Sequence, residues 1–382
     1  MFSSRQIGCA LSAAVIAAAG MASAKATETS ARNIAPASRP VQRQSARPPA
    51  RTPRAVARPQ AARAAPKQAP ASRPASRPAA RPTPKPVQPA QKPIAAGTGP
   101  RAPYRGAMAV DADSGRVLFA DLENNTAYPA SVTKLMTFLL VLEDVQAGHY
   151  GLGDKVAASA YAASMEPSSV GLRPGQTMTV DDLLYSIMVK SANDAAVALA
   201  EHAAWRRRGG QGVIPPETRG RALVDAFVDR MNRRAKELGM LSTRYASPNG
   251  LPPLASERRG FDTSTAADIA KLCRRVVGMR QALKYTSCAS HTVTDGSGKP
   301  LSLSTHNYFL PGSRDKDGYA RPVAGCDGLK TGFTAASGSS IALTASRDGR
   351  RVVVVVLGSA GRNARETAAG RILRDALDAV SW

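Results

Sequence analysis

The sequence predicts an α/β (α+β) fold in which one antiparallel sheet, flanked by helices, carries an inserted, mainly helical lobe. Short apolar runs bounded by turn residues lie near both ends of the region that follows residue 101, as is typical of strands. Segments with a helical spacing of apolar residues occupy the middle, from Val180 to about Leu283. Strands from both ends that enclose a helical middle favour a single sheet and a two-lobed enzyme shape.

Residues 1–24 have the pattern of a secretory signal peptide. Arg5 precedes an apolar, Ala-rich run from Ile7 to Met21, and a small-x-small cleavage site, Ala22-Ser23-Ala24, follows. The alternative is an uncleaved membrane anchor, because the run is nearly long enough to span a bilayer. Either interpretation predicts an exported chain at the periplasmic or another extracytoplasmic face, with membrane association through the N-terminus in the second case.

Residues 25–101 are rich in Pro, Ala and Arg and are predicted to form a disordered linker, because they lack the large apolar residues that a core needs. Sixteen basic residues and one acid, Glu28, give this segment +15 of the formal net charge of +24. Basic tracts bind nucleic acid by neutralising phosphates, but an exported chain meets anionic envelope polymers or a membrane surface instead. We therefore expect no nucleic-acid partner. A solvated spacer stiffened by polyproline II structure is the alternative.

The cysteine and histidine residues give little support to a metal site. Loss of Cys9 with the signal leaves Cys273, Cys288 and Cys326, so at most one internal disulfide can form. Export permits a bridge between Cys273 and Cys288, and three buried thiols are the alternative. The four histidines are scattered without the spacing of zinc ligands. No metal or other cofactor is expected.

The elements of residues 102–382 are predicted in chain order. Apolar runs at 107–110 and 117–120 flank Asp113-Ser114-Gly115 and indicate a β-hairpin, and a helix from Ser131 to about Val145 follows. The remaining elements are helices at 180–204, 221–240 and 264–277, strands at 339–346 and 351–358, and a helix at 364–380. The second of these strands is continuously apolar, as expected for a strand covered on both faces.

A serine and a lysine open the first predicted helix. Ser131 and Lys134 are three residues apart and share one face, and the lysine stands among apolar residues, where an ammonium ion is costly to desolvate. Burial and the positive end of the helix dipole both favour a neutral amine, which could remove the serine proton. A helix cap followed by a lysine that extends to solvent would explain the same residues. This motif alone is therefore weak.

Two further motifs decide between these interpretations. Ser191 and Asn193 interrupt an apolar helical segment, and Lys330-Thr331-Gly332 lies ahead of the last two strands. Taken singly, they could be a helix cap and an ordinary turn. Together and in this order, however, SxxK, SxN and KTG are the signature set of penicillin-binding proteins and serine β-lactamases. Segments 231–251 and 264–272 extend the resemblance to the D-alanyl-D-alanine carboxypeptidases among the low-molecular-mass penicillin-binding proteins, over nearly all of Tyr104–Trp382.

The resemblance implies a β-lactamase/transpeptidase-like fold and a serine peptidase of peptidoglycan biosynthesis. Ser131 would attack the carbonyl between two D-alanines of a stem pentapeptide, with Lys134 as general base, and the resulting acyl-enzyme would release the terminal D-alanine. Ser191 would relay a proton to the leaving amine. Asn193 would bind the substrate backbone or hold Lys134. Penicillin and other β-lactams would acylate Ser131 as covalent inhibitors.

The resemblance also implies how the substrate is bound. Lys330 and Thr331 would receive the terminal carboxylate through charge-assisted hydrogen bonds, with Thr334 as an additional donor. Gly332 would allow close approach of the strand. The backbone N–H groups of Ser131 and Phe333 would stabilise the oxyanion, and such donors are each typically worth about 2.7 to 4 kcal/mol.

Three other functions compete with this interpretation. A β-lactamase is disfavoured because no glutamate after the SxN motif is followed four positions later by asparagine, as it is in class A enzymes; penicillin should acylate this protein and stay. An endopeptidase that cuts cross-links is the nearer rival. A non-catalytic wall-binding protein is disfavoured by the intact motifs. Segments 206–221 and 311–325 look like insertions that could reshape the rim of the cleft.

Overall fold

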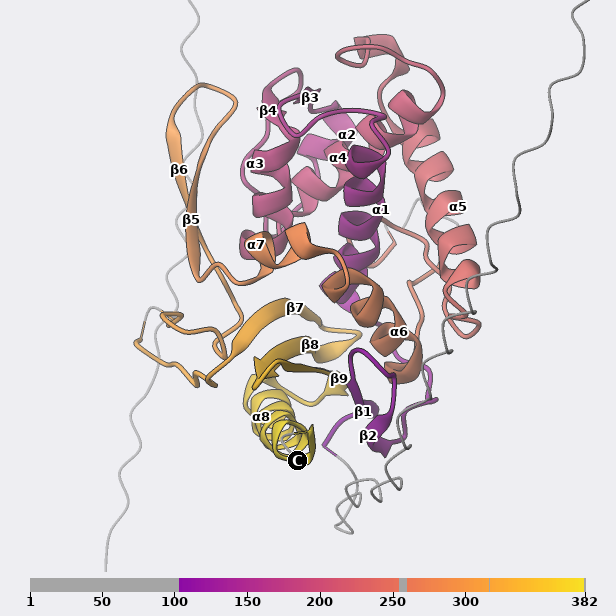
Figure 1. The fold of residues 1–382 in the computed structure, drawn as a ribbon. Coiled ribbons are helices and arrows are strands. Elements are labelled where there is room, and N and C mark those ends of the chain that lie inside the picture. The colour runs from indigo at the N-terminus through magenta and orange to yellow at the C-terminus, as the bar shows by residue number, and fades with distance from the viewer. Residues whose placement is uncertain (1–102, 254–259, 316, 381–382) are drawn as a thin grey trace, which may run out of the picture. The chain divides into compact units, whose positions relative to one another are not determined.

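A computed structural model describes residues 103–253, 260–315 and 317–380 (Figure 1). The predicted signal peptide and linker lie outside these residues. The main sheet has the strand order β2-β1-β9-β8-β7, and each neighbouring pair is antiparallel. Its strands are β1 (Gly106–Asp111), β2 (Val117–Asp121), β7 (Cys326–Thr334), β8 (Gly338–Arg347) and β9 (Arg350–Ser359). Residues from both ends of the described region thus form one sheet, which confirms the predicted fold class.

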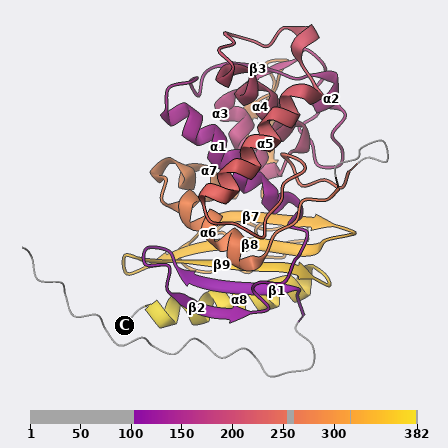
Figure 2. The same ribbon diagram turned by 90° about the vertical axis from the view of Figure 1, so that its right-hand side faces the viewer.

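The central strand β9 explains why the sheet has a layer on each face. Side chains of a strand alternate between faces, and here Val352, Val354 and Val356 pack with helix α8 (Arg362–Val380), while the residues between them join the core of the helical lobe. Figure 2 shows α8 on one side of the sheet and the helices, α6 (Ala266–Val277) among them, on the other. A continuously apolar strand is required because both faces are covered.

The helical lobe is organised around α4 (Asn193–Arg207), whose residues from Asn193 to Ala204 are all buried. A helix that is apolar on every side belongs in a core. The other helices of the lobe are α1 (Lys134–Gln146), α2 (Ala160–Ala163), α3 (Val180–Tyr185), α5 (Arg221–Glu237) and α7 (Leu283–Thr286). Short 3₁₀ turns occur at Pro216–Thr218 and Arg280–Ala282, and a small sheet pairs β3 (Lys155–Ala157) with β4 (Thr177–Thr179).

The structure contains α2, α7, β3 and β4, which were not predicted, and it differs from the predicted elements most clearly in three other places. Ser131 lies on a 3₁₀ turn, Ala130–Thr133, and α1 begins only at Lys134. The predicted helix 180–204 is divided into α3, a π-helical turn at Ser186–Lys190 and α4. A hairpin of β5 (Ser290–Thr294) and β6 (Pro300–Ser304) was not predicted, because most of its residues are at least partly exposed and leave no strong apolar pattern.

The described part of the chain also bears on the cysteines and on membrane association. Cys273 and Cys326 are buried free thiols, and Cys288 is a half-buried free thiol, so the bridge between Cys273 and Cys288 is absent. Within the described ranges, no helix is long and apolar enough to cross a membrane. No group of three or more potential metal-ligating side chains occurs there either.

One buried carboxylate on α4 leads to a prediction about stability and pH. Glu201 is fully buried and accepts a hydrogen bond from Ser159 Oγ at 2.7 Å, while its Oε2 has no partner among the described residues. Burial raises its pKa from 4.5 to about 7. Because the folded pKa lies above the unfolded value, the favourable contribution of the protonated form is present at low pH and is lost as pH rises from about 4.5 to about 7.

Replacing Glu201 with glutamine removes this titration while keeping the shape of the side chain. We expect Glu201→Gln to raise the free energy of unfolding by about 2 kcal/mol relative to the wild type at pH 8, and by much less at pH 5. Urea unfolding at the two pH values measures the difference. A difference of the same size at both pH values would show that ionisation of Glu201 is not the cause.

Candidate active site

The 3₁₀ turn before α1 brings the serine and lysine of the first motif together. Residues i and i+3 eclipse each other in a 3₁₀ turn, and Lys134 Nζ lies 2.9 Å from Ser131 Oγ. Lys134 is fully buried, whereas Ser131 is partly exposed and lines a cleft. The lysine therefore does not extend to solvent, and the alternative of a surface lysine is wrong.

The amine of Lys134 has two further partners. Nζ lies 2.5 Å from Asn193 Oδ1 and 2.7 Å from the backbone oxygen of Asn249. Both are oxygens that can only accept a hydrogen bond. A neutral amine has two N–H donors and one lone pair. It can therefore donate to both oxygens and still accept the hydroxyl proton of Ser131, which suits a general base.

Electrostatics favour this neutral form. Burial holds the pKa of Lys134 well below its usual range, and the positive charge of Lys330 lowers it further. The carboxylates of Asp262 and Asp194 act in the opposite direction but do not compensate. The sequence predicted that burial would favour the neutral amine, and the structure adds the acceptor geometry that fixes this amine.

The turn that carries Ser131 is supported by Asp262 and by the end of segment 231–251, to which the sequence analysis assigned no role in the site. Asp262 is buried and accepts hydrogen bonds from Thr133 Oγ1 at 3.0 Å and from both the backbone N–H and the hydroxyl of Ser247. Ser247 in turn accepts from the N–H of Gly250. Gly250 has φ +84°, and a Cβ there would lie 2.0 Å from the oxygen of Ala130. These contacts place the oxygen of Asn249 against Lys134.

The second motif lies where the helical segment breaks. Ser191 follows the π-helical turn in the left-handed conformation, with φ 64°, and α4 begins at Asn193. The side chain of Asn193 bonds Lys134 through Oδ1 and the oxygen of Pro167 through Nδ2, so it links the base to one wall of the cleft. The contact with Lys134 agrees with one of the two roles predicted for Asn193, and its role toward substrate stays a prediction.

The third motif lies on the edge strand β7, so KTG is part of a strand and not a turn. Lys330 is buried, and its Nζ lies 2.9 Å from Ser191 Oγ. Burial, together with the charge of Arg365, lowers the pKa of Lys330 to about 7. A Cβ on Gly332 would lie 2.8 Å from the oxygen of Pro129 and 3.1 Å from Ser131 N. Glycine therefore lets β7 approach the turn that carries Ser131.

The cleft between these motifs has a volume of about 800 Å³. Of the residues predicted from the sequence, it is lined by Ser131, Ser191, Asn193, Thr331, Gly332, Phe333 and Thr334. Phe333 is 67% exposed at the rim. The Thr334 hydroxyl lies 2.9 Å from Ser337 Oγ and accepts the N–H of Ser337, so it is already engaged in the turn that follows β7.

Eleven of the eighteen residues that line the cleft were not predicted as site residues, and four of them carry an aromatic ring or a guanidinium group. His306 and Tyr308 come from the segment between β6 and β7, and Arg362 and Arg365 come from the first turn of α8. Burial, with the charge of Lys330 acting in the same direction, lowers the pKa of His306 to about 4, so this ring is neutral at physiological pH. None of the four stands in a recognisable local motif, because they meet the site only through the fold.

No described residue of the two presumed insertions lines the cleft. Residues 206–221 contribute nothing to the lining of the cleft. Segment 311–325 contacts residues on or next to the cleft lining. Asp315 pairs with Arg362 at 3.1 Å, and the Tyr319 hydroxyl donates to Glu366, the neighbour of Arg365. Segment 311–325 therefore helps to hold Arg362 and Arg365 in place without lining the cleft itself.

The chain matches one protein family and is similar in sequence to proteins of known function. The sequence pattern of a family described as D-alanyl-D-alanine carboxypeptidase matches residues 98–361. The chain is 31% identical over 266 residues to D-alanyl-D-alanine carboxypeptidase DacF of Bacillus subtilis, covering 69% of this chain and 60% of that relative. It is also 28% identical over 288 residues to a D-alanyl-D-alanine endopeptidase of Pseudomonas aeruginosa, covering 75% of this chain and 78% of the relative.

Solved structures agree with the fold. A peptidoglycan synthesis regulatory factor (PBP3) from Streptococcus pneumoniae superposes with a TM-score of 0.61 and 28% identity, covering 73% of this chain and 72% of the other. Penicillin-binding protein D2 from Listeria monocytogenes, in an ampicillin-bound form, superposes with a TM-score of 0.56 and 27% identity, covering 72% and 97%.

Proposed function

This chain belongs to the D-alanyl-D-alanine carboxypeptidase family, and we propose that it is a serine-type carboxypeptidase that removes the terminal D-alanine from peptidoglycan stem pentapeptides. The observation that carries the proposal is the contact of 2.9 Å between Ser131 Oγ and a fully buried Lys134 amine. A nucleophile activated by a desolvated lysine is suited to acyl transfer. β-Lactams would be captured at the same serine.

In the acylation step, Lys134 Nζ takes the hydroxyl proton of Ser131 as Oγ bonds to the carbonyl carbon between the two D-alanines. The backbone N–H groups of Ser131 and Phe333 stabilise the oxyanion that forms. Ser191 passes a proton to the leaving nitrogen, the C–N bond breaks, and D-alanine departs. Water then attacks the ester carbonyl and gives a proton back through Ser191 and Lys330, and Lys134 returns its proton to Ser131 Oγ as the ester C–O bond breaks. The contact of Ser191 with Lys330 at 2.9 Å supports the relay, because it connects this hydroxyl to a second proton-carrying group.

The free carboxylate of the substrate would be bound on the side of the cleft where Lys330 lies. Lys330 and Thr331 supply the donors, and Thr334 adds a third if its hydroxyl turns away from Ser337. An incoming carboxylate favours the charged form of Lys330, whose pKa is about 7 in the free protein. Arg365 is 5% exposed and lines the cleft, and although Glu366 pairs with it at 2.9 Å, its guanidinium group keeps further N–H donors for an anionic chain end.

The remaining organisation of the chain is also a proposal. Residues 1–24 serve as a signal peptide, residues 25–101 as a basic linker and residues 102–382 as the peptidase domain, which places the enzyme at the extracytoplasmic face. The +15 charge of the linker supports contact with anionic envelope polymers or a membrane surface. An uncleaved signal would anchor the chain to the membrane.

A second activity is favoured by one comparison. The Pseudomonas aeruginosa relative is named an endopeptidase, and a cross-linked peptide presents the same D-alanyl bond with a longer leaving group. The carboxypeptidase assignment rests on Lys330, Thr331 and Arg365, which favour a substrate that ends in a free carboxylate.

Purified protein given pentapeptide monomers and cross-linked muropeptide dimers in parallel tests the assignment. We expect stoichiometric release of free D-alanine from the monomers, with kcat/KM for the monomers about tenfold or more above that for the dimers, since the monomer ends in a free carboxylate one residue beyond the scissile bond whereas the leaving group of the dimer is a whole second peptide. Chromatography of the products measures both. Preferential loss of the dimers would assign the endopeptidase activity instead, and loss of neither would contradict both proposals.

A further inference from the structure

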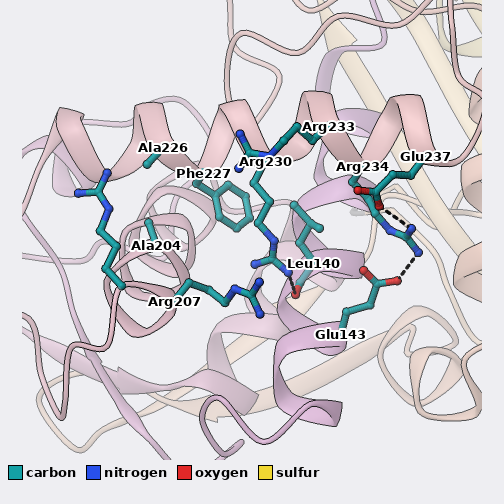
Figure 3. Close-up of a pocket in the computed structure, with 11 residues that line it drawn as sticks. Leu140, Glu143, Ala204, Arg207, Ala226, Phe227, Arg230, Arg233, Arg234 and Glu237 are labelled. Carbon is teal, nitrogen blue, oxygen red and sulfur yellow. Dashed lines mark hydrogen bonds and ion pairs between the residues drawn. The ribbon is translucent and has the colours of Figure 1, made fainter.

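A second cavity, of about 610 Å³, lies in the helical lobe and shares no lining residue with the Ser131 cleft. Helices α1, α4 and α5 and the residue after α4 supply its walls (Figure 3). We call it the arginine cavity, because five of its eleven lining residues are arginines: Arg207, Arg208, Arg230, Arg233 and Arg234. The proposed peptidase mechanism uses none of them.

Nearby carboxylates compensate only part of this charge. Glu143 accepts from Arg234 at 2.7 Å and from Arg275 at 2.9 Å, so one acid serves two guanidinium groups. Glu237 also pairs with Arg234. Buried Asp144 is held by both terminal nitrogens of Arg230, at 2.5 and 2.8 Å. Three acids thus face six guanidinium groups, which leaves an excess of three positive charges.

The unneutralised charges lie on different helices. Arg208 and Arg233 have no acidic partner among the described residues. Arg207 lies 4.0 Å from Asp144, which Arg230 already contacts at 2.5 Å. Figure 3 shows the side chains of Arg207 and Arg230 extending from facing helices toward the same space beside Leu140. Like charges brought together in this way repel one another, and a bound anion removes that repulsion.

The inner wall of the cavity strengthens such binding. Leu140, Ala204, Ala226 and Phe227 line it with apolar surface, and electrostatic attraction is stronger beside apolar surface than in open water. A fully solvated basic helix face would lack this concave, partly apolar setting.

We propose that the arginine cavity binds a ligand that carries at least two phosphate groups. A single carboxylate would neutralise one of the three excess charges, whereas a diphosphate can neutralise all three. The planar guanidinium group also matches phosphate oxygens with paired hydrogen bonds. Either a phospholipid head group with two phosphates or a soluble diphosphate provides this chemistry.

The test compares two double variants of the full chain at fixed ionic strength. Arg208→Gln/Arg233→Gln removes two exposed arginines that have no acidic partner, so no ion pair is broken. The matched control, Lys155→Gln/Arg280→Gln, removes two exposed positive charges outside the cavity. The two double variants therefore have the same net charge and the same basic linker. Titration calorimetry with inorganic diphosphate should show a Kd about tenfold or more weaker in the first variant and nearly unchanged in the control.

Two further probes make the outcome specific. Citrate, a polycarboxylate, should lose much less affinity than diphosphate in the cavity variant. Flotation with phosphatidylcholine vesicles that contain cardiolipin shows whether the ligand is a lipid or a soluble molecule. If only the cavity variant loses vesicle binding, the ligand is a lipid head group. If both variants bind vesicles as the wild type does, the ligand is a soluble diphosphate. Equal loss of diphosphate affinity in both double variants, no loss in either, or equal loss for citrate and diphosphate would overturn the proposal. Acylation by penicillin should stay normal in both variants, so this test is independent of the peptidase proposal.

Discussion

Replacing Ser131 with alanine is expected to abolish covalent capture of penicillin and to lower kcat/KM for a peptide ending in D-Ala-D-Ala by about 10⁴-fold or more. Ser131 Oγ is the hydroxyl that contacts the buried base at 2.9 Å. Removing it leaves Lys134 without a proton to take and the carbonyl without a nucleophile. Oxyanion donors and carboxylate binding remain, so the variant should still bind the peptide.

Intact-protein mass spectrometry after incubation with penicillin measures the first effect. The wild-type protein should gain the mass of one antibiotic molecule and keep it, because no deacylating Glu-x-x-x-Asn segment is present. Ser164→Ala, which removes an exposed hydroxyl outside the cleft, is the control and should gain the same adduct. An adduct on Ser131→Ala, or none on the wild type, would contradict the assignment of the nucleophile.

Residues that act through local sequence were predictable. The valines of β9 identify a strand covered on both faces, because continuous apolar sequence needs cover on both sides. Ser131, Lys134, Ser191, Asn193 and Lys330 were found because each motif keeps its reactive groups within three residues. In each motif, the residues that carry the reactive groups lie close together in the sequence.

The breaks in the elements were not predictable in the same way. Residues 180–204 were predicted as one helix although Ser191 and Asn193 interrupt its apolar spacing, and the chain in fact turns at Ser191. Contacts from distant segments fix that turn: the N–H of Asn193 bonds the oxygen of Ser168, and Lys330 holds the Ser191 hydroxyl. The hairpin of β5 and β6 had one local signal, the Asp295-Gly296 pair at its turn.

Groups that support the site through the backbone or from distant segments could not be assigned a role from the sequence. The oxygen of Asn249 bonds Lys134 from 115 residues away, and any residue could supply that atom. Asp262 steadies the turn of Ser131 from a segment without a motif. Arg365 reaches the cleft because α8 packs on the sheet. These residues become functional only when the two ends of the chain form one sheet.

Lys134 should be nearly as important as the serine. Replacing it with glutamine is expected to lower the rate of acylation by penicillin about 10²- to 10⁴-fold, because the variant has no group that can take the proton of Ser131. Glutamine is the informative choice. Its amide N–H groups can still donate to Asn193 Oδ1 or to the oxygen of Asn249, whereas an apolar side chain would leave both buried acceptors without a donor.

The pH dependence separates a base from a merely structural lysine. Burial and Lys330 lower the pKa of Lys134, so the neutral amine persists to lower pH than for an ordinary lysine, and wild-type acylation should slow only as pH falls through that lowered pKa. Lys134→Gln has nothing to titrate at this position and should lose that limb of the profile. Stopped-flow acylation across pH, with thermal unfolding to verify the fold, measures both. A variant that keeps the wild-type limb, at a rate within about threefold of the wild type, would show that another group is the base.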